Sequence, residues 1–178
     1  MICKIKRGQN FQGCLDYITG KYDKDKQAQV IMHSEGIPLL DNKTVAQIFE
    51  AYATKGNNNI REPVGHYAYS FHKKDGNRVT NELIRKIVRE HLELMGIKNT
   101  EFIMTRHYDT DHDHAHLMCS MVDRDGHVIS TAYEKERNAR ICKYLTKKYG
   151  FFISAGKMNV NRNKLRGREK LKYQFYDK

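Results

Sequence analysis

The segment from residue 107 to 116, His-Tyr-Asp-Thr-Asp-His-Asp-His-Ala-His, constrains the fold more than any other part of the chain. Side chains two residues apart on a strand point to the same face, so His114 and His116 can share one metal ion. An apolar run follows the pair and another precedes His107, while the polar residues between them are typical of a turn. The pattern therefore predicts an antiparallel hairpin that returns the chain beside His107.

Three imidazoles on one cation leave coordination positions open for water or substrate, which is typical of a catalytic metal site. A polar hairpin that binds metal only adventitiously is the alternative interpretation. His112 falls in the turn, so we do not expect it to be a ligand. Asp109 and Asp111 can be ligands, acceptors for a histidine N–H, or turn formers, and their spacing leaves these roles open.

The charge of the chain restricts its partners. Its 32 Lys and Arg against 21 Asp and Glu give a net charge of +11 and a pI near 9.5, which favours a polyanion, nucleic acid before membrane. No segment approaches the roughly 20 apolar residues of a transmembrane helix, and the first residues lack the apolar core of a secretion signal. We therefore expect a cytoplasmic protein with no membrane insertion, and neither disulfides nor a zinc knuckle from its four scattered cysteines.

Hydrophobic periodicity predicts an α+β fold with a mostly antiparallel sheet. The predicted strands are 2–7, 28–33, 64–72, 101–108 and 114–122, with a further weak short strand after a turn at Asp125-Gly126. The predicted helices run from Phe11 to about Gly20, from 43 to 54 with Asp41 or Asn42 as the cap, from 83 to 95, and from 134 to 149. His91 borders the apolar stripe of the third helix and is predicted to be a packing residue.

Alternation along the strands predicts which face of the sheet carries the site. Ala115 and Leu117 can face helices, whereas His114, His116 and Met118 face the other way. We therefore expect a two-layer protein whose second sheet face is the working surface. The alternating Tyr67, Tyr69 and Phe71 fit a core face at least as well as base-stacking positions, and His66, Ala68 and Ser70 lie on the opposite side.

With these features, the chain resembles the relaxase, or mobilisation nuclease, family of HUH endonucleases, in its P-type branch. Three signatures stand in the expected order over about residues 1 to 155: an N-terminal tyrosine in Cys14-Leu-Asp-Tyr17-Ile-Thr19, the strand His66-Tyr-Ala-Tyr-Ser70-Phe71, and His107-x-Asp-Thr leading to His114-x-His116. His112 departs from this pattern, because relatives commonly have an asparagine there.

The resemblance implies a function. A tyrosine attacks one phosphodiester at the transfer origin of a plasmid or mobile element, leaves a 5′-phosphotyrosine link and a free 3′-hydroxyl, and the strand is later resealed. The implied fold is a central antiparallel sheet of about five strands with helices on one face and single-stranded DNA plus metal on the other. The implied cofactor is Mg²⁺ or Mn²⁺, although three imidazoles also suit Zn²⁺, Ni²⁺ or Co²⁺. Accessory mobilisation proteins and a coupling protein are the further partners expected.

Helical geometry distinguishes the candidate nucleophiles. Tyr17 lies about 120° from the centre of the apolar stripe of its helix, whereas Tyr22 would lie within the stripe if the helix continued, so Tyr17 is the predicted nucleophile and Tyr22 the reserve. Asp109 is a candidate proton relay or a group that orients His107. Ser70 and His66 are predicted DNA contacts. The late basic helix and the tail are predicted to add further contacts through Arg137, Arg140, Lys143, Lys147 and Lys148, and through Lys157, Arg162, Lys164, Arg166 and Arg168.

Two other functions share some of these features. A rolling-circle replication initiator or a transposase of the same superfamily has the histidine pair, but there the pair commonly precedes the tyrosine. A non-catalytic origin-binding protein would keep the fold and the basic surface without cleavage. We expect residues 1–155 to form the catalytic domain, and 156–178 to begin a region that is truncated here.

Overall fold

The computed structural model describes residues 1–21, 27–55 and 59–153. Its sheet has five antiparallel strands in the order β1-β3-β5-β4-β2. The strands are β1 (Ile2–Gly8), β2 (Ala28–His33), β3 (Val64–Ser70), β4 (Phe102–His107) and β5 (His114–Ser120). The helices are α1 (Phe11–Ile18), α2 (Asn42–Ala53), α3 (Asn81–Leu94) and α4 (Glu134–Lys148), with a 3₁₀ segment at Lys73–Arg78. The predicted α+β class and the five-stranded antiparallel sheet are confirmed.

The predicted elements differ from the observed ones mainly at their ends. The third strand ends at Ser70 instead of residue 72, because His72 caps the 3₁₀ segment that follows, its side chain accepting from the N–H of Lys74. The weak strand predicted after Asp125-Gly126 is a single bridge between Val122 and Val128. Among the described residues, no helix has the length and apolar character needed to cross a membrane.

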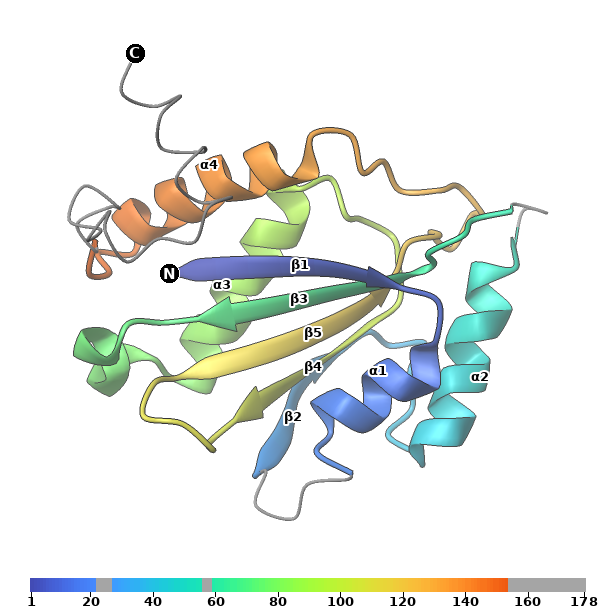
Figure 1. Cartoon of the computed structure of the whole chain (residues 1–178), viewed down its shortest axis with the longest axis horizontal. Coiled ribbons are helices and arrows are strands. Elements are labelled where there is room, and N and C mark those ends of the chain that lie inside the picture. Colours follow the sequence, from blue (N-terminus) through green and yellow to red (C-terminus); the bar gives the residue numbers. More distant parts are fainter. Residues whose placement is uncertain (22–26, 56–58, 154–178) are drawn as a thin grey trace, which may run out of the picture.

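The larger core lies on the sheet face covered by α3 and α4. It contains Tyr67 and Tyr69 of β3 and Leu117 of β5, all fully buried, so these aromatic residues are packing residues and do not form a base-stacking surface. His91 of α3 is also buried here, between the hydroxyl of Tyr69 at 3.0 Å and Oδ1 of Asn138 at 2.9 Å, which confirms its packing role. In Figure 1 the strands pass in front of α3.

A second core lies on the opposite sheet face and differs from the two layers that we expected. The stripe Phe11, Leu15 and Ile18 of α1 packs with α2 against Met118 of β5 and Ile103 of β4. Helices therefore cover both faces, because the apolar stripe of α1 needs an apolar partner and these strand residues provide one. The end of this face beyond Met118, toward the β4–β5 hairpin, carries the histidines.

Helix caps fix where α1 and α2 begin. The side chain of Asn10 accepts from the N–H of Gly13, and that of Asp41 accepts from the N–H of Thr44, which makes Asp41 the cap of α2. Next to Tyr17, the buried carboxylate of Asp16 accepts a 2.8 Å hydrogen bond from Asn42. The end of α1 is thereby held against the start of α2.

Candidate active site

The β4–β5 hairpin brings three histidines together. His107 pairs directly with His114 in the register, and His116 lies two residues further along the same face. One ring nitrogen from each residue lies within 4.8 Å of the other two, and the rings of His107 and His116 are 4.5 Å apart between centroids. A metal about 2.1 Å from each nitrogen needs a tighter set, so modest ring rotations would close these imidazoles around one cation. This donor set fits a divalent metal, as the sequence pattern predicts.

His107 is fixed by the end of α1. Its Nε2 lies 2.7 Å from the carbonyl oxygen of Ile18, and the hydroxyl of Thr105 donates to the same oxygen at 2.8 Å. A carbonyl oxygen only accepts hydrogen bonds, so Nε2 of His107 carries the proton and the neutral ring keeps its lone pair on Nδ1. The nitrogen available to a metal is therefore determined by a backbone group of α1.

His114 is held by residues of the turn. Oδ1 of Asp109 lies 3.2 Å from its Nε2, and Oγ1 of Thr110 lies 3.1 Å from its Nδ1. The Asp109 carboxylate therefore lies beside His114, whereas the sequence made it a candidate to orient His107. His112 is exposed in the turn, with its ring 5.6 Å from that of His114, and it is outside the three-histidine group.

Tyr17 approaches the histidines from α1. Its ring makes edge contacts with His116 at 5.5 Å and with His66 at 5.7 Å between centroids, while 49% of the residue remains exposed. The helix thus directs Tyr17 away from the apolar stripe, as its spacing predicts. The alternative nucleophile, Tyr22, lies outside the described residues.

β3 contributes two residues to the site face. His66 places its Nε2 3.0 Å from Nδ1 of His116, and Ser70 lies directly across the register from His114. Strand alternation predicts this face for both residues, but it does not predict the contact between the two histidines. Alternation within one strand gives the face of His66 and says nothing of its distance to another strand's side chain.

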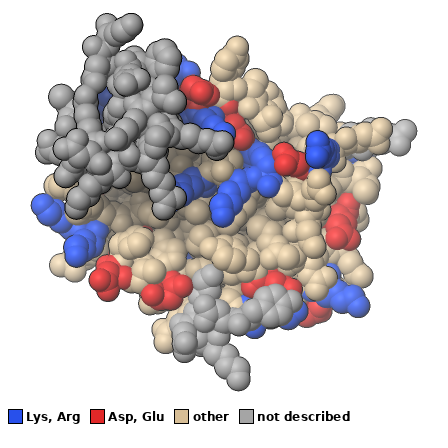
Figure 2. Space-filling model, in the orientation of Figure 1, with Lys and Arg blue, Asp and Glu red and all other residues tan. Residues whose placement is uncertain are grey.

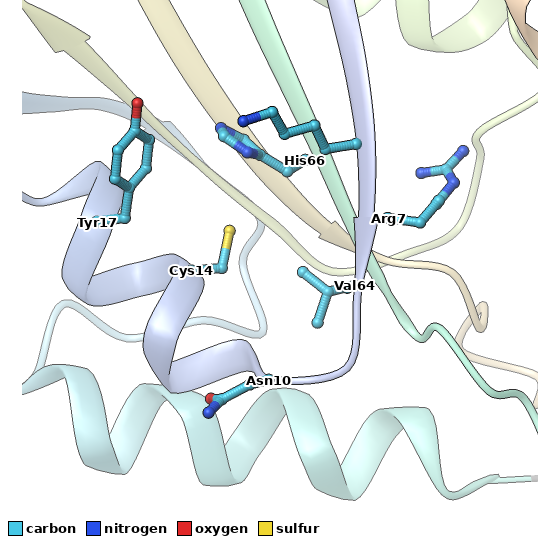
Figure 3. A pocket seen from close by; sticks show the side chains of 8 residues that line it. Arg7, Asn10, Cys14, Tyr17, Val64 and His66 are labelled. Atoms are coloured by element: carbon cyan, nitrogen blue, oxygen red, sulfur yellow. The ribbon is translucent and has the colours of Figure 1, made fainter.

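A pocket of about 220 Å³ opens between α1 and the adjoining ends of β1 and β3. Its lining residues are Lys6, Arg7, Gly8, Asn10, Cys14, Tyr17, Val64 and His66. Figure 3 shows Tyr17 and Cys14 on α1 facing His66 across this space, while the side chain of Arg7 extends away from it. The pocket therefore begins at the tyrosine and the histidine that border the three-histidine group.

Cys14 is the other nucleophile in this pocket, and its environment argues against that role. Burial raises the pKa of its thiol to about 12, so the thiol stays protonated at neutral pH, whereas the thiolate is the reactive form. All four cysteines, each in the described part of the chain, are free thiols. This leaves Tyr17 as the candidate nucleophile of the helix.

The basic residues divide between the two sides of the sheet. Lys4 and Lys6 of β1 are exposed and pair with Ala68 and His66, so they lie on the face of the site. Figure 2 shows Lys and Arg side chains gathered where β1 crosses this face. These two lysines are not among the DNA contacts predicted from sequence, although they alternate with apolar residues in the first strand.

The basic helix α4 lies on the opposite sheet face. Its buried residues Cys142 and Leu145 belong to the core with Tyr67 and Tyr69. Arg137 donates to the carbonyl of Met95 at the end of α3, and Arg140 and Lys143 are exposed. The structure does not bring these three predicted DNA contacts to the histidines. The predicted basic tail, Lys157 to Arg168, lies outside the described residues.

Comparison with known families identifies the family of the chain. The model of the MobA/VirD2-like relaxase nuclease domain matches residues 17–151, from the candidate nucleophile to the residues after α4. The chain belongs to the relaxase family. Its function is therefore of the relaxase type, DNA nicking by a nuclease domain that acts on single-stranded DNA, and the resemblance seen in the sequence is confirmed. A comparison with curated proteins finds no significant match.

Proposed function

We propose that this relaxase domain cleaves one DNA strand at a transfer origin by attack of Tyr17 on a phosphodiester, with a divalent metal held by His107, His114 and His116. One observation carries the proposal. A half-exposed tyrosine ring lies 5.5 Å from the ring of His116, and that histidine belongs to a three-imidazole group. A phosphate seated between the hydroxyl and the imidazoles is within reach of both.

A phosphodiester is anionic and repels nucleophiles. A divalent cation bound by the three imidazoles would neutralise the charge of the non-bridging oxygens and orient the phosphorus for attack. Three neutral nitrogen donors suit Mn²⁺, Zn²⁺, Ni²⁺ or Co²⁺, whereas Mg²⁺ prefers oxygen. We propose Mn²⁺ or Mg²⁺ as the metal in the cell, on the family resemblance, and expect purified protein to bind Zn²⁺, Ni²⁺ or Co²⁺ as well.

The bond changes are those of a transesterification. The oxygen of Tyr17 forms a bond to phosphorus, and the bond from phosphorus to the 3′-oxygen breaks. The phenol proton leaves to solvent or a base, and the departing 3′-oxygen gains a proton. The DNA 3′ of the cut stays on Tyr17 through its 5′-phosphate, and attack by a 3′-hydroxyl reverses the step. We assign to Asp109 the orientation of His114, because its carboxylate contacts that ring.

The pocket beside Tyr17 is the proposed seat of a nucleotide next to the scissile phosphate. It borders the nucleophile at one end, and Lys6 at its margin provides a charge complementary to the DNA backbone. We assign to Ser70, which lies across the register from His114, a hydrogen bond to a phosphate oxygen on the same face. The strand would then run over β1 and β3, past the histidines.

The test is covalent capture of DNA. The protein is incubated with Mn²⁺ and with single-stranded oligonucleotides that tile the mobile element carrying its gene. Each oligonucleotide is labelled at the 5′ end in one set and at the 3′ end in another. We expect one oligonucleotide to give a protein-linked adduct with the 3′ label and a shortened free product with the 5′ label. Chelation should abolish both.

Tyr17→Phe should bind that oligonucleotide and form no adduct. Tyr108→Phe is the matched control, since Tyr108 is 47% exposed against 49% for Tyr17 and follows His107, and it should form the adduct normally. An adduct in Tyr17→Phe that disappears in Tyr22→Phe would transfer the role to Tyr22. Specific binding of one oligonucleotide without cleavage under any metal would instead support the non-catalytic origin-binding protein.

A further inference from the structure

We infer that His66 is a positioning residue for the three-histidine site: it accepts a hydrogen bond from Nδ1 of His116 and so directs Nε2 of His116 toward the metal. The inference rests on the proposed role of His107, His114 and His116 as metal ligands. It assigns His66, predicted from sequence as a DNA contact, a role inside the protein.

The protonation of the two rings follows from one distance. Nε2 of His66 and Nδ1 of His116 are 3.0 Å apart, so one of these nitrogens must carry a hydrogen and the other a lone pair. A metal at His116 has to use the remaining nitrogen, Nε2, which must then carry a lone pair. The hydrogen of neutral His116 is therefore on Nδ1, His66 accepts it through Nε2, and His66 keeps its own hydrogen on Nδ1.

The other two histidines of the group are oriented in comparable ways. The carbonyl of Ile18 accepts from His107 at 2.7 Å, and the carboxylate of Asp109 lies 3.2 Å from His114. Metal-binding histidines usually donate their second ring N–H to a carboxylate, a carbonyl or water, which fixes the tautomer and the ring orientation. For His116, the imidazole of His66 takes the role of this acceptor. With this assignment, all three rings have a partner that orients them.

The position of His66 in the sheet makes this contact possible. Ala68 of β3, not His66, lies directly opposite His116, and His66 is the diagonal neighbour two residues away. A diagonal neighbour on an antiparallel pair is close enough for long side chains to meet. The small side chain of Ala68 leaves the space through which the two rings approach.

His66 also touches the nucleophile. Its ring makes an edge contact with Tyr17 at 5.7 Å, and Figure 3 shows both side chains entering the pocket from opposite sides. Loss of nicking in a His66 variant would therefore not distinguish a disturbed metal site from a displaced tyrosine. The test has to measure metal binding and the tautomer of His116 directly.

The probe is Mn²⁺ alone, titrated into metal-free protein, with free Mn²⁺ followed by electron paramagnetic resonance. We expect His66→Ala to weaken Mn²⁺ binding by about 10-fold to 100-fold. His66→Gln, whose amide oxygen can accept from His116, should restore most of the affinity. His33→Ala, at an exposed histidine on β2, is the matched control and should bind as the wild type does.

The second measurement is the ¹⁵N chemical shift of the His116 ring in metal-free protein, which reports the nitrogen that carries the hydrogen. We expect hydrogen on Nδ1 in the wild type and in His66→Gln, and a mixture of tautomers in His66→Ala. The chemical shift identifies the tautomer in any variant that folds. If His66→Ala does not fold, the wild type and His66→Gln are compared instead. Hydrogen on Nε2 of His116 in the wild type contradicts the inference.

The outcomes separate the two proposals. If His107→Ala abolishes Mn²⁺ binding while His66→Ala keeps wild-type affinity, the metal site stands and the role of His66 is overturned. The role is equally overturned if His66→Gln binds no better than His66→Ala. If His107→Ala itself binds Mn²⁺ with wild-type affinity, the three histidines are not the metal site and the proposed function fails.

Discussion

Nε2 of His107 lies 2.7 Å from the carbonyl oxygen of Ile18, the residue directly after Tyr17. The last carbonyls of a helix have no partner within the helix, so this one is available to the site. The contact joins the helix that carries the candidate nucleophile to the strand that carries a candidate metal ligand. The distance between Tyr17 and the three histidines is thus fixed through the backbone, with a second hydrogen bond from Thr105 to the same oxygen at 2.8 Å.

Replacing Thr105 by valine should weaken this connection. Thr105 is fully buried, and the substitution removes its hydrogen bond to Ile18 and its 3.3 Å contact with Nε2 of His107 with little change of shape. We expect the free energy of unfolding to fall by about 1 kcal/mol. Adduct formation should slow by up to about 100-fold, because a small displacement of a reacting group is costly. Urea unfolding and single-turnover DNA capture measure the two effects. Thr54→Val is the control, since the exposed hydroxyl of Thr54 donates to the carbonyls of Glu50 and Ala51 in its own helix. Wild-type capture by Thr105→Val would refute the link.

Metal binding should distinguish two histidines that are two residues apart. His114→Ala should abolish the rise in melting temperature that Mn²⁺ gives to the metal-free protein, because a ligand stabilises only the folded state that binds it. His112→Ala should keep the full rise, since His112 lies outside the three-histidine group. A metal at 100 times its dissociation constant adds about 2.7 kcal/mol, which thermal unfolding with and without chelator resolves. The reverse pattern would place His112 in the site.

Acidification should destabilise the protein through His91. Burial lowers the pKa of His91 to about 4, below its ordinary value of 6.5, so the unfolded chain binds the proton more readily than the folded one. The stability contributed by neutral His91 is complete above pH 6.5 and is lost as the pH falls from 6.5 toward 4, by at most about 3 kcal/mol.

This effect is measured as a difference between variants. Urea unfolding of wild type and His91→Gln at pH 7.5, 6 and 5 should show the glutamine variant losing less stability on acidification. His33→Gln, at an exposed position on β2, controls for the change of side chain and should lose as much stability on acidification as the wild type. Equal losses in wild type and His91→Gln would show that other groups carry the acid sensitivity.

Salt dependence should locate the DNA path. On single strands, each neutralised phosphate contributes about 0.7 to the slope of log affinity against log salt. Lys6→Gln should therefore reduce the magnitude of the slope for an oligo-dT strand by about 0.7 in fluorescence anisotropy titrations. Lys143→Gln, on the opposite sheet face, should keep the wild-type slope. A reduced slope in Lys143→Gln with an unchanged slope in Lys6→Gln would support the sequence-based prediction for α4 and contradict a path over β1.

The local sequence pattern is enough to predict the hairpin and the direction in which Tyr17 points. Strand periodicity of two puts His114 and His116 on one face, and a short polar turn between two apolar runs returns the chain to His107. Helical periodicity separates Tyr17 from the stripe Phe11, Leu15 and Ile18, which the structure buries. These features are local, so residues near in sequence are sufficient to specify them.

The neighbours of these residues depend on contacts between distant parts of the chain. The contact of His66 with His116 spans 50 residues, and those of Thr105 and His107 with Ile18 span 87 and 89. Periodicity states which face of an element is apolar and does not state which neighbour covers it. For this reason the packing of α1 on the site face, and of the basic helix α4 on the other, followed from how the separate apolar stripes found partners across the sheet.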